Sequence, residues 1–580
     1  MINVPIHLTM VNTCFKERKR KYLLFYWIIF LLIMAFPKVY TQDHTIEEKP
    51  PLTPAWALEP WIWEDNGNTR GTITEVMTGY RHHNIPFGVV LIDSPWQTAY
   101  NSFVWDTLRY PDPQGFIDAL HANDIRVVVW LTAFFNRTAR HVLQPKHPQY
   151  DWIKSQGYTV NNGQDDEWWM GKGIHLDFTN KDAVNWWHTQ LDKIIDMGID
   201  GFKTDGGANN IGDTIVTSKG KMTREDYRKL YYTDVYDYLR KKNPEGIILA
   251  RPYSHQGGYA APVSKCPVGW CGDFLGNWDG LQLQMDNIYK SAQSGYGMVG
   301  CEIGGFVYRA RSNKEQLIRY TQLGALLPVM INGGFNGGLS NHLPWFHDDE
   351  TVRIYRYYAT LHSELVPYIF SFGVHSHETG KPVIKSSDIE NAQHLLGTEI
   401  FVSPIVNDEL FKKVVFPDSH YWIDYWNEDR VFSPGSELYY SSSIERIPLF
   451  LKAGAIIPMN VKNGVTEHGD ESSKDKLTVI IYPYKESSVK YNIPSGEGLA
   501  YNPIIIDVNE KTGEIRLISE VKSDVIIRVK SFTKPTSITG ADSWRYDSVK
   551  RLIHIHTSKR DVKLKINGLA GYSSIIHIDS

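Results

Sequence analysis

The stretch Gly198-Ile-Asp-Gly-Phe-Lys-Thr-Asp205 combines a short apolar strand with a lysine and a carboxylate at its carboxyl end. Its two glycines mark a tight junction between a preceding helix and this strand. An Asp directly after a strand is often only a turn former or the N-cap of the next helix, and the following Gly206-Gly207 suits a turn. The neighbouring segments therefore decide whether Asp205 has a structural or a chemical role.

Apolar strand patterns recur on both sides of this stretch, and helical patterns separate them. The helical patterns have apolar residues three and four positions apart, most clearly at 72–83, 115–122, 182–197, 281–294 and 314–326. Eight strand-then-helix units over about 300 residues predict an α/β fold, a (β/α)8 TIM barrel. The expected strands are residues 56–63, 87–93, 125–131, 198–205, 246–251, 268–273, 297–302 and 327–332.

Charged side chains end five of these expected strands: Asp93, Asp205, Arg251, Asp273 and Glu302. The carboxyl ends of all barrel strands open on one face, and the active sites of barrel enzymes lie on that face. Turn chemistry alone does not readily explain such a ring of charges. The ring therefore favours an active site that includes Asp205.

The sequence pattern changes after the barrel. A helical segment at 351–371 closes it, and short alternating strands with turns begin beyond residue 383. We expect a C-terminal all-β sandwich domain, or two of them. The expected limits are 43–54 for a linker, 55–382 for the catalytic barrel, 383–462 for a proximal β-sandwich and 463–580 for a distal β domain.

Residues 1–42 have the organisation of an export signal, with a basic cluster at 16–21 and an apolar run at 22–36. Because the run is short for a membrane-spanning helix, a cleaved signal peptide is favoured over an uncleaved signal anchor. We therefore expect a secreted or periplasmic, extracytoplasmic protein. Its membrane contact would be limited to such an anchor.

The composition excludes several classes of function. At 580 residues and 42% hydrophobic content the chain can form several large cores, and its net charge of -4 offers no basic surface for nucleic acid. Its four cysteines form no CxxC pair or Cys/His cluster, so neither a metal site nor a cofactor is expected. The 18 Trp and 33 Tyr suit the faces of sugar rings, and equally an ordinary core.

The charged strand ends come in the order and spacing of a known family. The segments Gly201-Phe-Lys-Thr-Asp205, Arg251-Pro-Tyr-Ser, Trp270-Cys-Gly-Asp273 and Glu302-Ile-Gly-Gly-Phe306 resemble the motifs of glycoside hydrolase family 31. The resemblance extends to residues 396–404 and 447–458, and covers roughly residues 54–460. This combination of motifs is highly specific.

The resemblance implies a retaining α-glycosidase with Asp205 as the nucleophile and Asp273 as the acid/base. A retaining reaction needs one ionised and one protonated carboxyl group, about 5–5.5 Å apart, and two strand ends of one barrel can supply them. Lys203 shares the strand face of Asp205 and is expected to help keep it ionised.

Six residues are expected to bind substrate: Asp93, Trp130, Lys203, Arg251, Trp270 and His342. The resemblance implies that Asp93, Arg251 and His342 contact hydroxyls of the bound sugar. The alternative is an Asx turn for Asp93, an ion pair at the barrel rim for Arg251 and a purely structural role for His342. The two tryptophans are expected as stacking platforms, with burial in the core as the alternative.

Several features depart from the usual family pattern. Glu302 stands where the family usually has Asp, Gly206-Gly207-Ala208 follows Asp205, and Asp93 lies in Ile-Asp-Ser-Pro-Trp. Only a short linker precedes the first strand, where the family usually has a β-sandwich domain. The chain therefore resembles an atypical member, outside the best-known α-glucosidase subgroup.

The leading hypothesis is an exported retaining α-glycosidase that acts on terminal α-linked sugars of an oligosaccharide or glycoside. Two alternatives remain: an α-transglycosylase that uses the same carboxylates, and a catalytically silent sugar-binding barrel. The related α-galactosidase families also join lysine to aspartate after strand four, but their acid does not lie in a Trp-x-Gly-Asp motif. Glucose, xylose and galactose all remain open as the sugar, and so does the oligomeric state.

Overall fold

The computed structural model describes residues 48–576, apart from residues 66, 139–144, 170, 207–210, 307–311, 335–341, 410, 442 and 522 and the side chain of Cys301. The export signal expected at 1–42 lies outside the described residues. Within this described part of the chain, no helix is long and apolar enough to cross a membrane.

Eight parallel strands close into a barrel, which confirms the predicted fold class. The strands pair in the order β1-β15-β14-β13-β10-β7-β3-β2, so each neighbours its predecessor among the barrel strands. Their continuous apolar runs fit strands that are buried on both faces. The barrel strands are β1 (Trp61–Glu64), β2 (Val89–Ile92), β3 (Arg126–Leu131), β7 (Gly201–Thr204), β10 (Ile247–Ala250), β13 (Val268–Trp270), β14 (Val299–Ile303) and β15 (Val329–Gly334).

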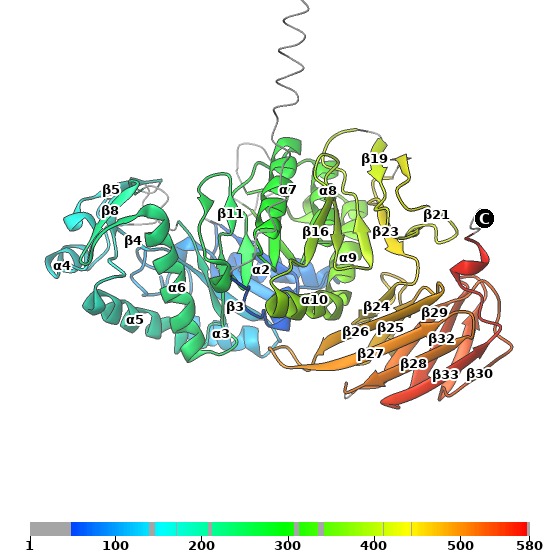
Figure 1. Ribbon diagram of the computed structural model, residues 1–580. Coiled ribbons are helices and arrows are strands. Elements are labelled where there is room, and N and C mark those ends of the chain that lie inside the picture. Colours follow the sequence, from blue (N-terminus) through cyan, green and yellow to red (C-terminus); the bar gives the residue numbers. More distant parts are fainter. Residues whose placement is uncertain are drawn as a thin grey trace, which may run out of the picture. The chain divides into compact units, whose positions relative to one another are not determined.

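Helices connect the barrel strands and surround them (Figure 1). Amphipathic spacing explains their packing: in the helix before β7, for example, Trp187, Leu191 and Ile194 are buried on one face. The helices are α2 (Arg70–His82), α3 (Pro113–His121), α4 (Tyr150–Ser155), α5 (Lys181–Ile195), α6 (Arg224–Lys242), α7 (Trp278–Gln293), α8 (Lys314–Gly324), α9 (Asp349–Glu364) and α10 (Val366–Thr379).

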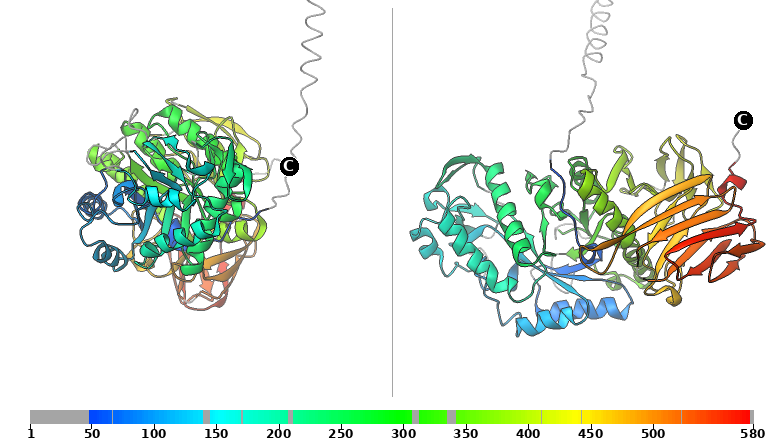
Figure 2. Two further views of the ribbon diagram at one scale, coloured as in Figure 1. Left: turned by 90° about the vertical axis from the view of Figure 1, so that its left-hand side faces the viewer. Right: turned by 60° about the horizontal axis from the view of Figure 1, so that its bottom comes forward.

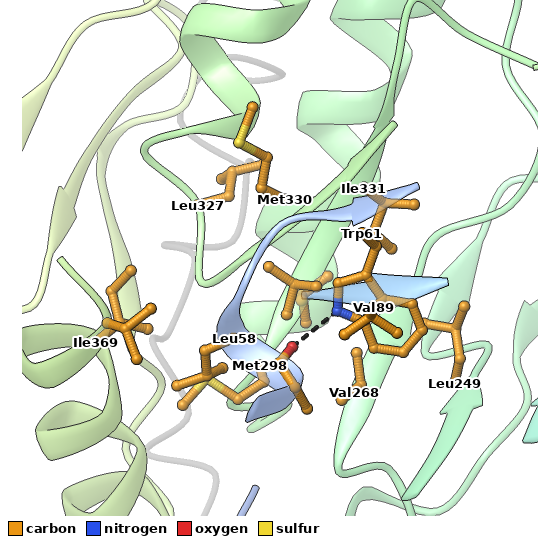
Figure 3. Close-up of a cluster of buried hydrophobic side chains, with 14 of the residues drawn as sticks. Leu58, Trp61, Val89, Leu249, Val268, Met298, Leu327, Met330, Ile331 and Ile369 are labelled. Atoms are coloured by element: carbon orange, nitrogen blue, oxygen red, sulfur yellow. Dashed lines mark hydrogen bonds between the residues drawn. The ribbon is translucent and has the colours of Figure 1, made fainter. Parts of the chain in front are cut away.

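The barrel core continues into the segment before β1 (Figure 3). Leu58 and Trp61 pack with side chains from β2, β10, β13, β15 and α10, and the Trp61 indole N–H donates to the Ala57 carbonyl at 2.9 Å. Both side chains are fully buried. Burial of each such large side chain stabilises the fold by roughly 1.5–3 kcal/mol.

Two predictions of secondary structure were partly wrong. Residues 56–58 belong to a 3₁₀ helix, Ala55–Leu58, and the first strand begins only at Trp61. The helix expected at 351–371 is two helices, because Pro367 has no N–H to donate and its ring would clash with the carbonyl of residue 363 in a continuous helix. Pro367 instead lies in the first turn of α10, where a proline fits.

Three small antiparallel sheets lie on the loops between barrel elements. The three-stranded sheet after β3 brings Trp168 beside the backbone of Gly206, next to the end of β7. The sheets are β4-β6-β5 (Phe134–Asn136, Gly171–His175, Asp166–Trp168), β8-β9 (Thr214–Thr217, Gly220–Thr223) and β11-β12 (Tyr253–Ser254, Gly258–Tyr259).

The C-terminal part is built of β-sheets, as predicted. A six-stranded and a two-stranded sheet come first, in the orders β16-β17-β18-β23-β20-β21 and β19-β22. Their strands are β16 (Ile384–Asp388), β17 (Gln393–Leu396), β18 (Ile400–Val402), β19 (Phe411–Val415), β20 (Trp422–Asp424), β21 (Val431–Phe432), β22 (Glu437–Ser441) and β23 (Leu449–Lys452).

Two five-stranded sheets follow and face each other (Figures 1 and 2). β24 already belongs to this distal pair of sheets through its pairing with β25; the domain limits given above stay predictions. The sheets are β24-β25-β29-β32-β31 (Ile456–Met459, Leu477–Ile481, Val525–Lys530, Leu552–Thr557, Ser543–Asp547) and β26-β27-β28-β33-β30 (Glu486–Pro494, Tyr501–Asn509, Glu514–Ser519, Asp561–Asn567, Ser537–Thr539).

Candidate active site

The carboxylate of Asp205 follows β7 directly, and four hydrogen bonds hold it. Its Oδ1 accepts from Arg251 Nη2 at 2.7 Å, Arg251 Nε at 3.1 Å and the Gly206 amide at 2.6 Å. Its Oδ2 accepts from the Trp130 indole at 3.1 Å. The side chain thus has a fixed orientation at the carboxyl end of the barrel.

Arg251 links Asp205 to the second expected carboxylate. Its Nη2, which binds Asp205, also lies 3.6 Å from Asp273 Oδ2, and its Nη1 donates to Gln256 at 3.1 Å. The side chains of Asp205 and Asp273 remain 14% and 25% exposed, while that of Arg251 is only 5% exposed. Both carboxyl groups are therefore open to a ligand, and the arginine lies behind them.

The surroundings move the pKa values of the two carboxyl groups in opposite directions. Burial disfavours the charged form of Asp205, but the charges of Arg251 and Lys203 and the hydrogen bonds outweigh it and lower the pKa. Burial, reinforced by the negative charge of Asp205, raises the pKa of Asp273 despite the opposing charge of Arg251. The two pKa values thus move apart, which favours the ionised form of Asp205 and the protonated form of Asp273, the division of roles that general acid catalysis next to a nucleophile requires.

A second ion pair lies deeper in the same end of the barrel. Lys203 Nζ donates to Asp93 Oδ2 at 2.8 Å, and the Ser94 amide donates to Asp93 Oδ1 at 2.6 Å. The lysine lies 4.0 Å from the ring centre of Trp63 and 4.3 Å from that of Trp270. Burial disfavours its charge, but the neighbouring carboxylates, Asp93 first, raise its pKa. Lys203 therefore stays an ammonium between two aromatic rings.

Glu302, the residue at the family's aspartate position, is buried on β14. Its Oε2 has no hydrogen-bond partner among the described residues. Burial raises the pKa of Glu302 well above its ordinary value, against the opposing charge of Lys203. Burial therefore favours the uncharged form of this side chain.

His342 lies at the same end of the barrel but has protein partners on both ring nitrogens. Its Nδ1 lies 2.6 Å from Asn332 Oδ1, and its Nε2 lies 2.9 Å from Glu64 Oε1. Because the ring is also buried, a substrate would have to displace one of these partners to bind it. Its expected substrate contact stays a prediction.

The two expected tryptophan platforms are almost completely buried. The indole N–H of Trp130 donates to Asp205, and its ring stacks with that of Trp168, with the ring centres 6.2 Å apart. Arg251 lies 3.9 Å from the ring centre of Trp270, which also contacts Lys203. Both rings therefore position charged groups in this structure, and their predicted stacking on a sugar stays untested.

Sequence reasoning missed several residues of this site. Trp63 and Glu64 lie at the carboxyl end of β1, and Asp93 lies in the corresponding place after β2. Their position at a strand end could therefore have predicted them. Gln256 and the amide of Gly206 carry no such signal, because their role depends on loop geometry. In the part of the chain that the structure describes, no group of three or more His, Cys, Asp or Glu side chains could hold a metal ion.

Comparison with known proteins agrees with this geometry. The Glycosyl hydrolases family 31 TIM-barrel domain matches residues 50–372, and the Glycosyl hydrolase family 31 C-terminal domain matches residues 378–457. The chain belongs to glycosyl hydrolase family 31. The predicted family is thereby confirmed.

Curated members of family 31 are similar along most of this chain. The isomaltosyltransferase of Sporosarcina globispora is 24% identical, with 89% of this chain and 53% of the relative covered. Alpha-glucosidase 2 of Bacillus thermoamyloliquefaciens is 25% identical, with 92% and 67% covered. The chain thus spans about half to two thirds of the length of these relatives.

Solved family 31 structures share the fold. The cycloalternan-forming enzyme from Listeria monocytogenes in complex with a pentasaccharide substrate superposes with a TM-score of 0.78 at 23% identity, over 90% of this chain and 55% of that one. A family 31 dextranase of Flavobacterium johnsoniae complexed with glucose has a TM-score of 0.77 at 19% identity, with 90% and 71% covered.

Proposed function

We propose that this chain is a retaining α-glycosidase that cleaves terminal α-linked sugars through a covalent glycosyl-enzyme on Asp205. One observation carries the proposal: Arg251 contacts two strand-end carboxyl groups whose pKa values move apart, downward for Asp205 and upward for Asp273. An ionised and a protonated carboxyl group side by side are what glycoside cleavage needs.

In the first step, a carboxylate oxygen of Asp205 attacks the anomeric carbon. The bond to the leaving-group oxygen breaks, and that oxygen takes the proton of Asp273. In the second step the Asp273 carboxylate takes a proton from water, the water oxygen attacks the anomeric carbon, and the ester to Asp205 breaks. Three hydrogen bonds hold Asp205 Oδ1 and one holds Oδ2 among the described residues, so Oδ2 is the better nucleophile.

The approach of both carboxyl groups to one guanidinium nitrogen is compatible with the close spacing of a retaining enzyme. Arg251 Nη2 lies 2.7 Å from Asp205 Oδ1 and 3.6 Å from Asp273 Oδ2, so these oxygens are no farther apart than the two distances added together. This bound on one pair of oxygens is compatible with the spacing of about 5–5.5 Å that a retaining reaction needs.

Substrate hydroxyls would bind the charged groups around this pair. Asp93, which pairs with Lys203, is an acceptor for the hydroxyls of the terminal sugar, and Arg251 is a donor beside the nucleophile. Which of glucose, xylose or galactose fills the site depends on one or two hydroxyl contacts.

Transfer to a sugar instead of water is the second candidate. The similarity to an isomaltosyltransferase supports it, since the same two carboxyl groups can serve both reactions. Product analysis at high concentrations of an added sugar acceptor distinguishes them: new oligosaccharides mean transfer, and free sugar alone means hydrolysis.

A panel of nitrophenyl α-glycosides tests the proposal. Wild type should hydrolyse at least one of them, and Asp205→Ala should lose about 10⁴-fold or more in kcat, because the covalent route is removed. Asp286→Ala, on the exposed face of α7, is the matched control. Full activity of a folded Asp205→Ala protein would refute the assignment.

Export is a further part of the proposal, and the basic and apolar segments at 16–36 support it. Mass spectrometry of the protein recovered outside the cell should show an N-terminus beyond the apolar run. A protein recovered only from the cytoplasm with that run intact would contradict export.

A further inference from the structure

A cavity of about 750 Å³ lies where α9 meets the loops and strands of the C-terminal sheets, and the expected active-site residues are not part of its lining. The lining comes from α9, the segment after β20, the loop at 465–468, β29 and the turn before β32. It includes seven Lys or Arg and four Asp or Glu side chains. The cavity therefore has a positive lining in a chain whose net charge is -4.

Ion pairs within the lining use all four of its acidic side chains. The pairs are Lys530 with Glu428, Arg551 with Asp429, Arg353 with Glu445, and Lys550 with Glu467. Two of these pairs, Lys530–Glu428 and Arg551–Asp429, join the distal sheets to the segment after β20, and Lys550–Glu467 joins two loops of one distal sheet. These acids therefore hold the walls of the cavity together, and the lining has more cations than acids.

Arg528 is the most deeply buried cation of this lining, with 3% exposure. It donates to Ser473 Oγ at 2.9 Å and contacts His554, and its Nε has no partner among the described residues. Burial, followed by the charge of Arg528, lowers the pKa of His554 to about 4, so the histidine is neutral at pH 7. No carboxylate lies within 4.0 Å of Arg528 in the described part of the chain. Asp470 and Glu364 act on Arg528 only from beyond that distance, so its direct partners are a hydroxyl and a neutral ring. A further anion in contact with the guanidinium would offset the cost of burying its charge.

Aromatic side chains form the rest of the wall. The Trp426 indole donates to the Ile447 carbonyl at 2.6 Å, which fixes its ring. The Tyr425 hydroxyl lies 2.8 Å from that of Tyr357 and 3.0 Å from His468 Nε2. Flat, fixed rings beside polar groups suit the C–H face and hydroxyls of a sugar ring.

We propose that this cavity binds an anionic saccharide, whose carboxylate pairs with Arg528 and whose ring packs against the aromatic wall at Trp426. A sugar ring with an acidic substituent matches both the charge excess and the aromatic wall. The site is separate from the catalytic pair, so the proposal does not depend on the proposed glycosidase activity.

Isothermal titration of the full chain with glucuronate, glucose and inorganic phosphate tests the proposal. Glucuronate should bind more tightly than either comparison ligand, and its affinity should fall as salt concentration rises. Arg528→Met should weaken glucuronate binding roughly tenfold to a hundredfold, the range for one charge-assisted hydrogen bond in a buried site. Arg356→Gln, a change on the half-buried face of α9, should also weaken it.

Two control variants locate the binding. Lys565→Met removes a cation on β33, in the other distal sheet and outside this lining, and Asp205→Ala changes the catalytic site; both should leave glucuronate affinity unchanged. Equal affinity for phosphate and glucuronate would overturn the saccharide assignment, and tighter binding of glucose would overturn the anionic one. If Arg528→Met does not fold, unchanged binding in Arg356→Gln overturns the site itself.

Discussion

Arg251 is the residue on which the electrostatics of the candidate site depend. It forms two hydrogen bonds with Asp205 and a longer ion pair with Asp273, while its own side chain is buried. One guanidinium therefore lowers the pKa of both carboxyl groups, while burial and the negative charge of Asp205 raise that of Asp273.

Arg251→Gln should move the whole pH profile of kcat/KM to higher pH. Loss of the guanidinium raises the pKa of Asp205, so the acidic limb moves up, and raises that of Asp273, so the alkaline limb follows. The value at the optimum should fall roughly 100-fold. The control is Arg126→Gln. Arg126 lies at the start of β3 and pairs with Asp200, and its replacement should leave the pH profile of kcat/KM unchanged. Unmoved limbs in Arg251→Gln would count against this assignment.

Glu302→Gln tests whether the buried acid on β14 is uncharged. The amide has nearly the same shape and no charge, so kcat/KM should stay within about threefold of wild type and its alkaline limb should not move. Lys203, Asp273, Arg251 and Asp93 are the charged groups that act on Glu302. If Glu302 is ionised instead, removing its charge lowers the pKa of Asp273 and shifts the alkaline limb to lower pH.

From the sequence, only the site residues at the ends of barrel strands could be predicted. Asp93, Asp205, Arg251 and Asp273 follow barrel strands directly or within three residues, and closure of the barrel brings them to one end. The burial of Trp130 and the two protein partners of His342 could not be predicted, because both depend on side chains far away in the sequence. Loop amides such as that of Gly206 have no sequence signal at all.

Among the secondary-structure elements, long periodic patterns predicted correctly that a helix or strand exists, but they did not predict where it begins and ends. All eight barrel strands exist, since their apolar runs are continuous and helices with one apolar face separate them. The 3₁₀ helix Ala55–Leu58 looked like a strand because apolar content alone does not separate the two. The break at Pro367 was missed because the apolar spacing continues through it.

Asn313→Ala should lower the free energy of unfolding by about 1 kcal/mol. Asn313 caps α8 in a reciprocal arrangement: its Oδ1 accepts from the Gln316 amide at 2.9 Å, and the Gln316 side chain accepts from the Asn313 amide at 3.0 Å. Urea denaturation measures the change. Asn313→Asp, which caps a helix equally well, should keep wild-type stability, and equal losses in both variants would contradict a capping role.

At the scale of the described chain, the distal sheets are tied to the barrel by more than one contact. The Ala55 and Trp56 amides donate to the carbonyls of Gly498 and Glu497 at 3.0 and 2.7 Å. The Asn492 amide donates to Ser371 Oγ of α10 at 2.9 Å. The β26-β27 hairpin therefore holds both the segment before β1 and the helix after the barrel.

We expect the barrel and the distal sheets to unfold together. Calorimetry of the full chain should give one main transition, because separate unfolding would expose the apolar surface of α10. Deleting residues 477–576 should leave a chain that binds a hydrophobic dye and aggregates. Two well-separated transitions, or a soluble and compact truncated chain, would show that the parts are independent.

The central claim is the covalent bond to Asp205, and an activated fluorosugar tests it most directly. Incubation with a 5-fluoro α-glycosyl fluoride of the preferred sugar, followed by peptide mass spectrometry, locates the adduct. The account predicts one sugar per chain on the peptide that contains Asp205, with slow release in water and faster release when an acceptor sugar is added. An adduct on any other residue, or product formation with no adduct under turnover, would contradict it.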